Sequence, residues 1–294
     1  MNSKRRSLLF VPADSEKFIR KAVSLPRLDA VILDLEDGVS PDRKQQARDN
    51  LCRAVEELHD ACKEVFVRIN DIASLRGIED LLHIVTLPPH LMPEGVLIPK
   101  ATERSVTAAD AVIAAAQEDA HTPFSLGILL MIETAYSLSN IRSILSASCR
   151  IQGLVFGAED YTNDLDVEKE QAKDMLLYAK CTAVNWAKAC NIDAFDTPCT
   201  DFKNPEVYLS EIAQAKKLGF SGKACIHPVM VDAVNDSFSP SPQQISRAKL
   251  LLEAYEEGIR QHKGAVSFEG KMIDLPIAQR AKKILQKAGE LSDN

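Results

Sequence analysis

Eight short runs of β-branched and other apolar residues recur along the chain, and a longer stretch with helical periodicity follows each of them. The runs are 7–11, 30–35, 65–69, 95–98, 126–132, 151–156, 192–195 and 222–226. Continuous apolar runs of this kind are typical of strands covered on both faces, as in a parallel sheet. The helices are expected near 14–24, 40–60, 74–85, 103–119, 137–147, 169–190, 204–217 and 229–235.

Eight strand–helix units predict an α/β fold, a closed (β/α)8 TIM barrel over residues 1–236. An open, doubly wound sheet that binds a dinucleotide would require G-x-G-x-x-G after a strand. The sequence contains neither this motif nor a Walker A loop. The closed barrel is therefore the expected architecture.

The remaining residues, 237–294, predict a C-terminal helical extension. Ser241 is expected to cap a helix, with Pro242 at the first helical position and Gln244 completing a capping box. A strand-like piece follows at 266–268, and a last helix is expected over 276–287. Because this segment is too small to hold much core alone, we expect it to pack as a lid on the barrel or on a neighbouring subunit.

Charge and composition argue against several classes of function. The 42 acidic residues outnumber the 35 basic ones, and a net charge of −7 disfavours a general nucleic-acid binder. No apolar run reaches 18 residues, so no membrane-spanning helix is expected. The apolar stretch after the basic start 1–6 ends at Pro12, which is too short for a signal peptide, and the seven cysteines form no C-x-x-C pair. A cytoplasmic protein with reduced thiols is expected.

Charged side chains stand at the ends of the predicted strands, which in such a barrel open toward one mouth. They include Asp34, Glu36, Asp37, Arg68, Lys100, Glu133 and Asp160. Carboxylates crowded into one mouth raise each other's pKa values unless a cation is present. Mg²⁺ prefers oxygen ligands and is commonly held by one or two protein carboxylates, which leaves positions for water and a chelating substrate. We therefore expect a Mg²⁺ cofactor, with Mn²⁺ as an alternative.

Five segments around these strand ends carry a family resemblance. They read RSLLFVP at 6–12, VILDLEDGV at 31–39, VRIN at 67–70, IET at 132–134 and FGAED at 156–160. In order and spacing they resemble the citrate lyase β-subunit-like family, which belongs to the pyruvate-type aldolase and acyl-CoA lyase barrels. The tail segment FEGKMIDLP at 268–276 is similar to the lid of the malyl-CoA and citramalyl-CoA lyase branch.

The resemblance implies a metal site at the barrel mouth. Glu133 and Asp160 match the pair that binds Mg²⁺ in the family. Asp34, Glu36 and Asp37 match an acidic cluster that holds metal-bound water.

The resemblance also implies the groups that act on the substrate. Arg68 matches an arginine that contacts the keto or hydroxy acid. Asp274 matches a lid carboxylate that acts as acid or base from an adjacent subunit. From the residues alone, an equally simple use of Asp274 is to cap a helix just ahead of Pro276.

Binding of CoA, a multiply charged anion, calls for a local basic surface. Residues 1–48 contain ten basic and seven acidic residues, although two solvated helix faces would produce the same excess. The resemblance assigns to CoA the positions Phe10, Lys17, Lys21, Arg43, Lys44, Arg48 and Lys100. Further candidates for substrate contact at the rim are Thr134, Gly157, Ala158, Glu159, His227 and Pro228.

Together these features imply a Mg²⁺-dependent lyase that cleaves a β-hydroxyacyl-CoA by a retro-Claisen reaction into an α-keto acid and acetyl-CoA. Citramalyl-CoA, which releases pyruvate, is the favoured substrate, and malyl-CoA and citryl-CoA are alternatives. A citrate lyase β subunit acting on an acyl-carrier-protein thioester, or a class II aldolase acting on free 4-hydroxy-2-oxo acids, remains open. We expect a homo-oligomer, a trimer or hexamer, in which subunits exchange their lids.

Overall fold

A computed structural model of the chain describes residues 5–119, 123–262 and 264–291. Residues 1–4 of the basic start at 1–6 lie outside the described residues. Eight parallel strands form a closed barrel in sequence order. The strands are β1 (Ser7–Pro12), β2 (Ala30–Asp34), β3 (Glu64–Arg68), β4 (Gly95–Ile98), β5 (Gly127–Ile132), β6 (Ile151–Phe156), β7 (Asp193–Asp196) and β8 (Gly222–Cys225). The predicted TIM barrel is confirmed.

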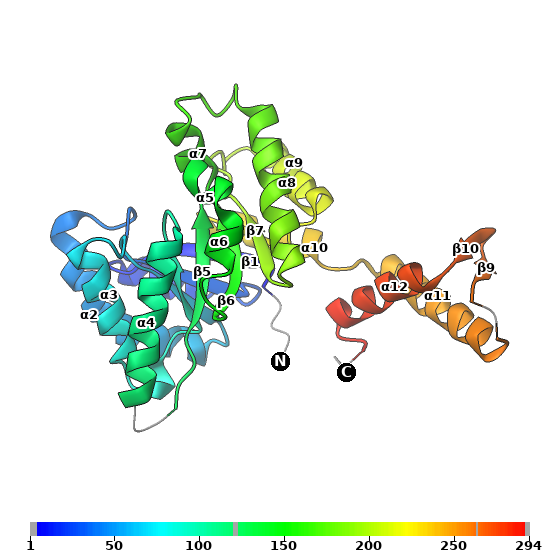
Figure 1. Ribbon diagram of the computed structural model, residues 1–294, viewed down its shortest axis with the longest axis horizontal. Helices are drawn as coiled ribbons and strands as arrows, with labels where there is room; N and C mark the ends of the chain where they lie inside the picture. Colours follow the sequence, from blue (N-terminus) through cyan, green and yellow to red (C-terminus); the bar gives the residue numbers. More distant parts are fainter. Residues whose placement is uncertain (1–4, 120–122, 263, 292–294) are drawn as a thin grey trace. The chain divides into compact units, whose positions relative to one another are not determined.

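Helices surround the strands (Figure 1). They are α1 (Glu16–Val23), α2 (Lys44–Asp60), α3 (Leu75–Val85), α4 (Glu103–Asp119), α5 (Ala135–Ser139), α6 (Ile141–Leu145), α7 (Ala158–Asp164), α8 (Lys173–Ala189), α9 (Pro205–Leu218) and α10 (Val231–Phe238). Short 3₁₀ turns precede α2, β4 and α10, at η1 (Pro41–Arg43), η2 (Pro89–Leu91) and η3 (Pro228–Met230). The single helix expected over 137–147 is divided at Asn140, and α7 was not expected.

Alternate residues of the strands fill the barrel interior. This inner cluster includes Leu8, Ala30, Ile32, Phe66, Leu97, Leu129, Met131, Val155, Phe195 and Ala224, with Phe10 packed against it. Since Phe10 lies two residues beyond Leu8 on β1, it occupies the next layer toward the carboxyl ends of the strands. Phe10 and Met131 therefore form part of the floor beneath the barrel mouth.

The described residues divide into two compact units, one comprising Arg5–Asn235 and the other beginning at Asp236. The C-terminal unit contains α11 (Pro242–Arg260), the antiparallel strands β9 (Val266–Phe268) and β10 (Lys271–Ile273), and α12 (Leu275–Ala288). The capping box expected at Ser241 and Gln244 is present. Strand β10 was not expected. Glu269 and Gly270, both at positive φ, form the turn of this hairpin.

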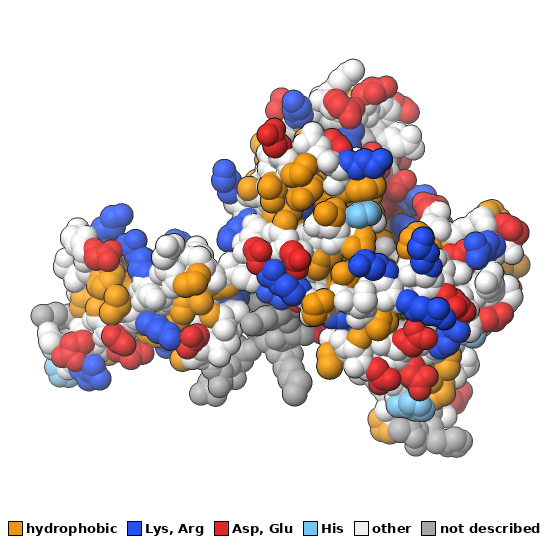
Figure 2. Space-filling view, turned by 180° about the vertical axis from the view of Figure 1, so that it is seen from behind, with side chains coloured by type: hydrophobic (Ala, Val, Ile, Leu, Met, Phe, Trp, Pro, Cys, Tyr) orange, Lys and Arg blue, Asp and Glu red, His pale blue; other side chains and the backbone are white. Residues whose placement is uncertain are grey.

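Helices α11 and α12 pack on each other through a small apolar core made of Ala248, Leu252, Ala278, Ala281 and Leu285. Hydrophobic side chains also reach the surface of this unit, as Figure 2 shows for one face. The large exposed ones are Leu250, Ile259, Met272, Leu275 and Leu291. Within the described part of the chain, no helix is both long and apolar enough to cross a lipid bilayer.

Candidate active site at the barrel mouth

The loop after β2 is organised by the carboxylate of Asp34. Its Oδ1 accepts the amide of Glu36 at 2.8 Å, and its Oδ2 accepts the amide of Gly38 at 2.9 Å. A Cβ on Gly38 would lie 2.3 Å from Oδ2 of Asp34, so only glycine allows this close approach. Asp34 therefore fixes the loop that presents Glu36, which is buried, and Asp37, which is exposed.

Arg68, at the end of β3, lies across from Asp34 in the sheet register. Its Nε and Nη2 donate to the two oxygens of Asp34 at 2.8 and 2.6 Å, and its Nη1 lies 2.8 Å from Oε2 of Glu36. The guanidinium also lies over the Phe10 ring, with Cζ 5.1 Å from the centroid. Burial alone would lower the pKa of Arg68, but Asp34 and Glu36 outweigh it and raise the pKa. The structure thus holds a fixed positive charge above the barrel floor.

Glu133 follows β5 and is 1% exposed. Its Oε1 accepts the backbone amide of Lys100 at 2.7 Å, whereas its Oε2 is buried without a hydrogen-bond partner. Burial raises the pKa of Glu133 to about 8; the Lys100 amide opposes this rise, and the charges of Asp160 and Glu36 add to it. A buried carboxylate oxygen with no donor is a costly arrangement unless a cation or a proton completes it.

Lys100 adopts a positive φ of 44°, which is uncommon for a non-glycine residue. This conformation directs its amide to Glu133. Burial acts to lower the pKa of the Lys100 ammonium, but the acidic groups around it, chiefly Glu36 and Asp160, raise it overall. Backbone strain of this kind is typical of sites where a particular atom must be placed.

Asp160 lies half-buried in the first turn of α7. The start of this helix is held by the amide of Ala158, which donates to Oγ1 of Thr197 at 3.1 Å. Gly157, just before it, permits the approach to β5, because a Cβ there would lie 2.7 Å from Oε2 of Glu133. Glu159 points elsewhere, since its carboxylate lies 2.5 Å from Nζ of Lys169.

These residues fit a hard divalent cation. Glu133 offers an unpartnered buried oxygen, and Asp160 is near enough for its charge to act on Glu133. Among the described residues, no group of three His, Cys, Asp or Glu side chains forms a ready-made metal cluster. Two carboxylates with open positions are the donor set that Mg²⁺ commonly takes from a protein.

Glu36 completes the acidic group. Burial raises the pKa of its carboxyl to about 7, Arg68 opposes this rise, and Asp37 and Asp34 add to it. The structure therefore gathers Asp34, Glu36, Arg68 and Glu133 into one electrostatically coupled site.

The basic residues assigned to CoA separate into two groups. Lys17, Lys21 and Arg43 have exposed side chains on α1 and just before α2. Lys44 and Arg48 are buried instead, each 8% exposed. The Lys44 ammonium donates to two backbone carbonyls, and Arg48 is paired with Asp80. Neither charged group is presented to solvent, so the structure gives both an internal role.

The rim candidates also have identified contacts. Thr134 caps α5 by accepting the amide of Ser137 at 3.0 Å. The His227 ring stacks on Phe202 with centroids 4.4 Å apart, and its Nδ1 accepts the amide of Val229 at the start of η3, where Pro228 begins the turn. These contacts fix the shape of the rim. The charged groups of the site are those of Asp34, Glu36, Arg68 and Glu133, described above.

Asp274 caps α12 in the C-terminal unit, where its Oδ1 accepts the amide of Ile277 at 3.4 Å. The structural use considered for this residue is thus present. Its assigned role as acid or base stays a prediction.

Two polar residues at the site were not among the candidates. Asn70, just past β3, and Asp80, on α3, are buried and bonded to each other. A signal for Asp80 exists in the sequence. It falls on the face of α3 shared by Gly77, Leu81 and Ile84, where an acidic residue is costly unless it is paired.

Comparison with known proteins shows which family the chain resembles. Residues 6–228 match the family model HpcH/HpaI aldolase/citrate lyase. The citrate lyase subunit beta of Haemophilus influenzae is 34% identical over 97% of each chain, and the mitochondrial citramalyl-CoA lyase of Rattus norvegicus is 29% identical over 98% of this chain and 87% of that one. The crystal structure of CitE from Mycobacterium tuberculosis with magnesium, acetoacetate and coenzyme A has a TM-score of 0.76 and 27% identity over 99% of this chain and 100% of that one.

The barrel, the strand-end charges and these matches lead to one conclusion. The chain belongs to the HpcH/HpaI aldolase/citrate lyase family and is a carbon–carbon lyase.

Proposed function

We propose that the chain is a Mg²⁺-dependent acyl-CoA lyase that cleaves a β-hydroxyacyl-CoA thioester, with citramalyl-CoA as the favoured substrate, into pyruvate and acetyl-CoA. The observation that carries the proposal is the buried, unpartnered oxygen of Glu133 beside the fixed guanidinium of Arg68. The magnesium, acetoacetate and coenzyme A named for the related CitE structure support it. Malyl-CoA and citryl-CoA are the neighbouring substrates to be compared.

In this proposal Glu133 and Asp160 would hold the ion, which would supply Lewis-acid polarisation of the substrate oxygen that becomes the keto group. Arg68 orients the acid end of the substrate and offers positive charge where negative charge develops. Phe10 and Met131 exclude water from beneath it, because both pack on the apolar barrel interior.

Cleavage breaks the carbon–carbon bond, removes the proton of the substrate hydroxyl as that oxygen becomes the keto group, and adds one proton to the acetyl methyl carbon. Asp274 is proposed to give the proton to this carbon in cleavage and to remove it in the reverse direction. The lid formed by 266–276 would deliver this carboxylate from the same subunit or a neighbouring one. Lys17, Lys21, Arg43 and Lys100 are proposed to meet the phosphates of CoA, since their charged groups are exposed.

The test is turnover of citramalyl-, malyl- and citryl-CoA by the purified protein, with and without EDTA. Release of pyruvate or another keto acid that requires Mg²⁺ supports the proposal. Absence of cleavage of all three thioesters contradicts it.

Asp274→Asn separates the chemical role of the lid carboxylate from its cap. Asparagine caps a helix as well as aspartate does but cannot transfer the proton, so turnover is expected to fall about 10²- to 10⁴-fold at unchanged thermal stability. A variant with normal turnover contradicts the assignment of Asp274.

A second candidate function is favoured by the match to citrate lyase subunit beta, which is the higher in identity of the two named relatives. In that case the substrate is an acyl-carrier-protein thioester, and the isolated chain would leave CoA esters uncleaved. Offering the same acyl group on a carrier protein and on CoA distinguishes the two functions.

A further inference from the structure

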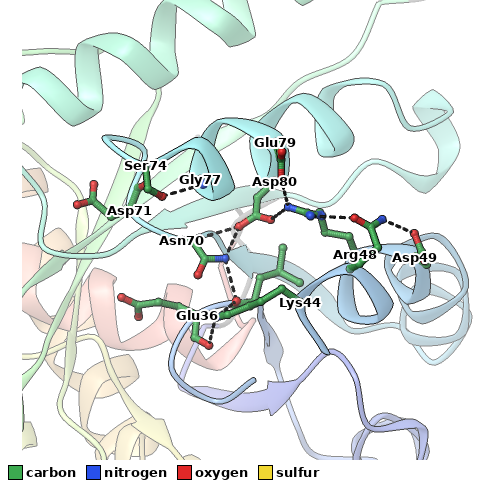
Figure 3. A network of polar contacts seen from close by, with 12 residues as sticks. Glu36, Lys44, Arg48, Asp49, Asn70, Asp71, Ser74, Gly77, Glu79 and Asp80 are labelled. Atoms are coloured by element: carbon green, nitrogen blue, oxygen red, sulfur yellow. Dashed lines mark hydrogen bonds and ion pairs between the residues drawn. The ribbon is translucent and has the colours of Figure 1, made fainter. Parts of the chain in front are cut away.

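A buried polar network contacts the backbone of the β2–α2 loop (Figure 3). The Asp80 carboxylate is its centre. Oδ2 accepts both the backbone amide of Asn70 at 2.9 Å and its side-chain amide at 2.6 Å, and Oδ1 accepts Nη1 of Arg48 at 3.0 Å. Asp80 is 1% exposed, so these contacts are shielded from solvent and correspondingly strong.

The network ends on two backbone carbonyls. Nζ of Lys44 donates to the carbonyl of Leu35 at 2.7 Å and to that of Glu36 at 2.6 Å. The Asn70 side chain donates to the same Leu35 carbonyl at 2.9 Å. In Figure 3 the Glu36 side chain leads away from Arg48 and Asp80, so the network holds the backbone of Glu36 while its carboxylate faces the site.

The start of α3 packs closely against the segment that joins β3 to α3. Ser74 caps the helix by accepting the amide of Gly77 at 3.2 Å. A Cβ on Gly77 would lie 2.5 Å from the carbonyl oxygen of Asn70 and 2.2 Å from that of Asp71. The first turn of α3, the helix that carries Asp80, thus packs directly against the backbone that follows β3. A shift of α3 would therefore also displace Asn70.

We propose that Lys44, Asn70 and Asp80 are positioning residues, which hold the carbonyls of Leu35 and Glu36 so that the Glu36 carboxylate stays against Arg68. The proposal rests on the proposed function, because it assigns these residues to the same site. It replaces phosphate binding as the role of Lys44 and makes Arg48 the partner that orients Asp80.

The physical reason is the placement of charge. Glu36 contacts Arg68 at 2.8 Å and its charge acts on Glu133, so a shift of the loop changes both groups at once. Lys44 carries the only ammonium that the described residues place on these two carbonyls. Without it the two carbonyls lose their charged donor and keep only the neutral amides of Asn70 and Val39, and the neighbouring carboxylates lose a nearby positive charge. Loss of such supporting contacts commonly costs about 10- to 100-fold in metal affinity or activity.

The experiment uses Lys44→Met in the full chain, with kcat, KM for the CoA thioester and amide hydrogen exchange of residues 35–39 as readouts. We expect kcat to fall about 10- to 100-fold while KM changes less than about twofold, and exchange over 35–39 to quicken.

Lys63→Met is the matched control. Lys63 is also a buried lysine, 6% exposed, but it lies just before β3, at the opposite end of the barrel from the mouth. Its loss can lower thermal stability but is expected to leave kcat and the exchange of 35–39 unchanged. A purely structural effect of removing a buried ammonium would make the two variants alike.

Asp80→Asn is the second variant and decides the question if Lys44→Met does not fold. It keeps the shape of the side chain and removes the charge that binds Arg48, and the same fall in kcat at constant KM is expected. A raised KM with unchanged kcat in either variant overturns the proposal, because it identifies a CoA contact. Unchanged kcat, KM and exchange in both also overturn it. If the wild-type chain cleaves no thioester, the proposed function fails, and the exchange of 35–39 alone decides the role of Lys44.

Discussion

At the scale of single residues, the proposed metal site depends on Gly157, which supplies no metal ligand of its own. A Cβ at position 157 would lie 2.7 Å from both Cβ and Oε2 of Glu133. Gly157→Ala is therefore expected to displace the Glu133 carboxylate and to weaken Mg²⁺ binding about 10- to 100-fold. Calorimetric titration of the metal-free protein with Mg²⁺ measures this change.

Gly264→Ala serves as the control for this glycine substitution, because a Cβ there meets nothing within 4 Å. It is expected to bind Mg²⁺ as the wild type does. Equal affinities in Gly157→Ala and the wild type would show that Glu133 is not the ligand.

The raised pKa of Glu133 predicts that the stability of the metal-free protein depends on pH. Burial raises the pKa of Glu133 to about 8 and that of Glu36 to about 7, both above the ordinary value of 4.5. Without metal, the folded protein thus binds more protons than the unfolded chain between about pH 4.5 and pH 8. The contribution of both groups to stability is present in acid, below about 4.5, and is lost as the pH rises toward 8.

Denaturant unfolding of the EDTA-treated protein between pH 5 and pH 9 checks this sign. We expect the free energy of unfolding to fall across this range by less in Glu133→Gln than in the wild type. Mg²⁺ binds the ionised carboxylate, so its affinity should rise with pH. Identical pH slopes in variant and wild type would falsify the assignment of the raised pKa to Glu133.

At the scale of elements, a buried ionic cluster joins the strands β7 and β8 to the helices α8 and α9. Asp196 is fully buried, with Nζ of Lys223 2.7 Å from its Oδ2 and Nζ of Lys180 2.9 Å from its Oδ1. Glu211 on α9 lies 3.3 Å from the same Lys223 ammonium. Burial alone would raise the pKa of Asp196, but the two lysines hold it below its ordinary value.

Asp196→Asn is expected to lower the free energy of unfolding by about 3–5 kcal/mol, since it removes the charged partner of the Lys180 ammonium and leaves that of Lys223 with Glu211 alone. Denaturant unfolding at neutral pH measures the loss. The exposed acid Glu257, paired with Arg260 on α11, provides the comparison. Glu257→Gln should leave the free energy of unfolding unchanged. If Asp196→Asn also leaves it unchanged, the cluster does not stabilise the barrel.

The strands were predictable because each is buried on both faces and therefore reads as a continuous apolar run. The polar helix α7 escaped prediction because seven residues that begin at Ala158 present no apolar periodicity. Strand β10 has only three residues and is recognisable only through its pairing with β9. Lys44 and Arg48 were placed on the correct helix, but their burial depends on α3 and β3, which are distant in sequence. The local sequence pattern does not contain information on contacts between elements that are distant in sequence.

At the scale of the whole molecule, the residues proposed to act in the reaction belong to two different units of the chain. Glu133 and Arg68 belong to the barrel unit, and Asp274 belongs to the C-terminal unit. The C-terminal unit exposes several large apolar side chains, including Met272 and Leu275 on either side of Asp274. Exposed apolar side chains beside a proposed catalytic group indicate a surface that is covered in the working protein. We proposed above that the barrel of the same or of a neighbouring subunit covers it.

If subunits exchange lids, two variants that are each inactive should complement each other in a mixed oligomer. Glu133→Gln retains Asp274 but loses the metal ligand, whereas Asp274→Asn retains the metal site but loses the acid or base. Each variant alone is expected to be inactive. If subunits exchange lids, an oligomer containing both contains some sites with Glu133 from one chain and Asp274 from the next, so co-expression should restore turnover of the CoA thioester.

The control is the double variant Glu133→Gln/Asp274→Asn co-expressed with wild type, which contains the same substitutions but confines them to one chain. Because a lid exchange in this mixture pairs intact and altered groups at random, its activity per wild-type chain should fall below that of wild type alone. A lid that closes on its own barrel predicts the opposite in both mixtures. The two single variants would then remain inactive together, and the wild-type chain would keep its full activity beside the double variant. The two mixtures thus distinguish a site built by one chain from a site built by two.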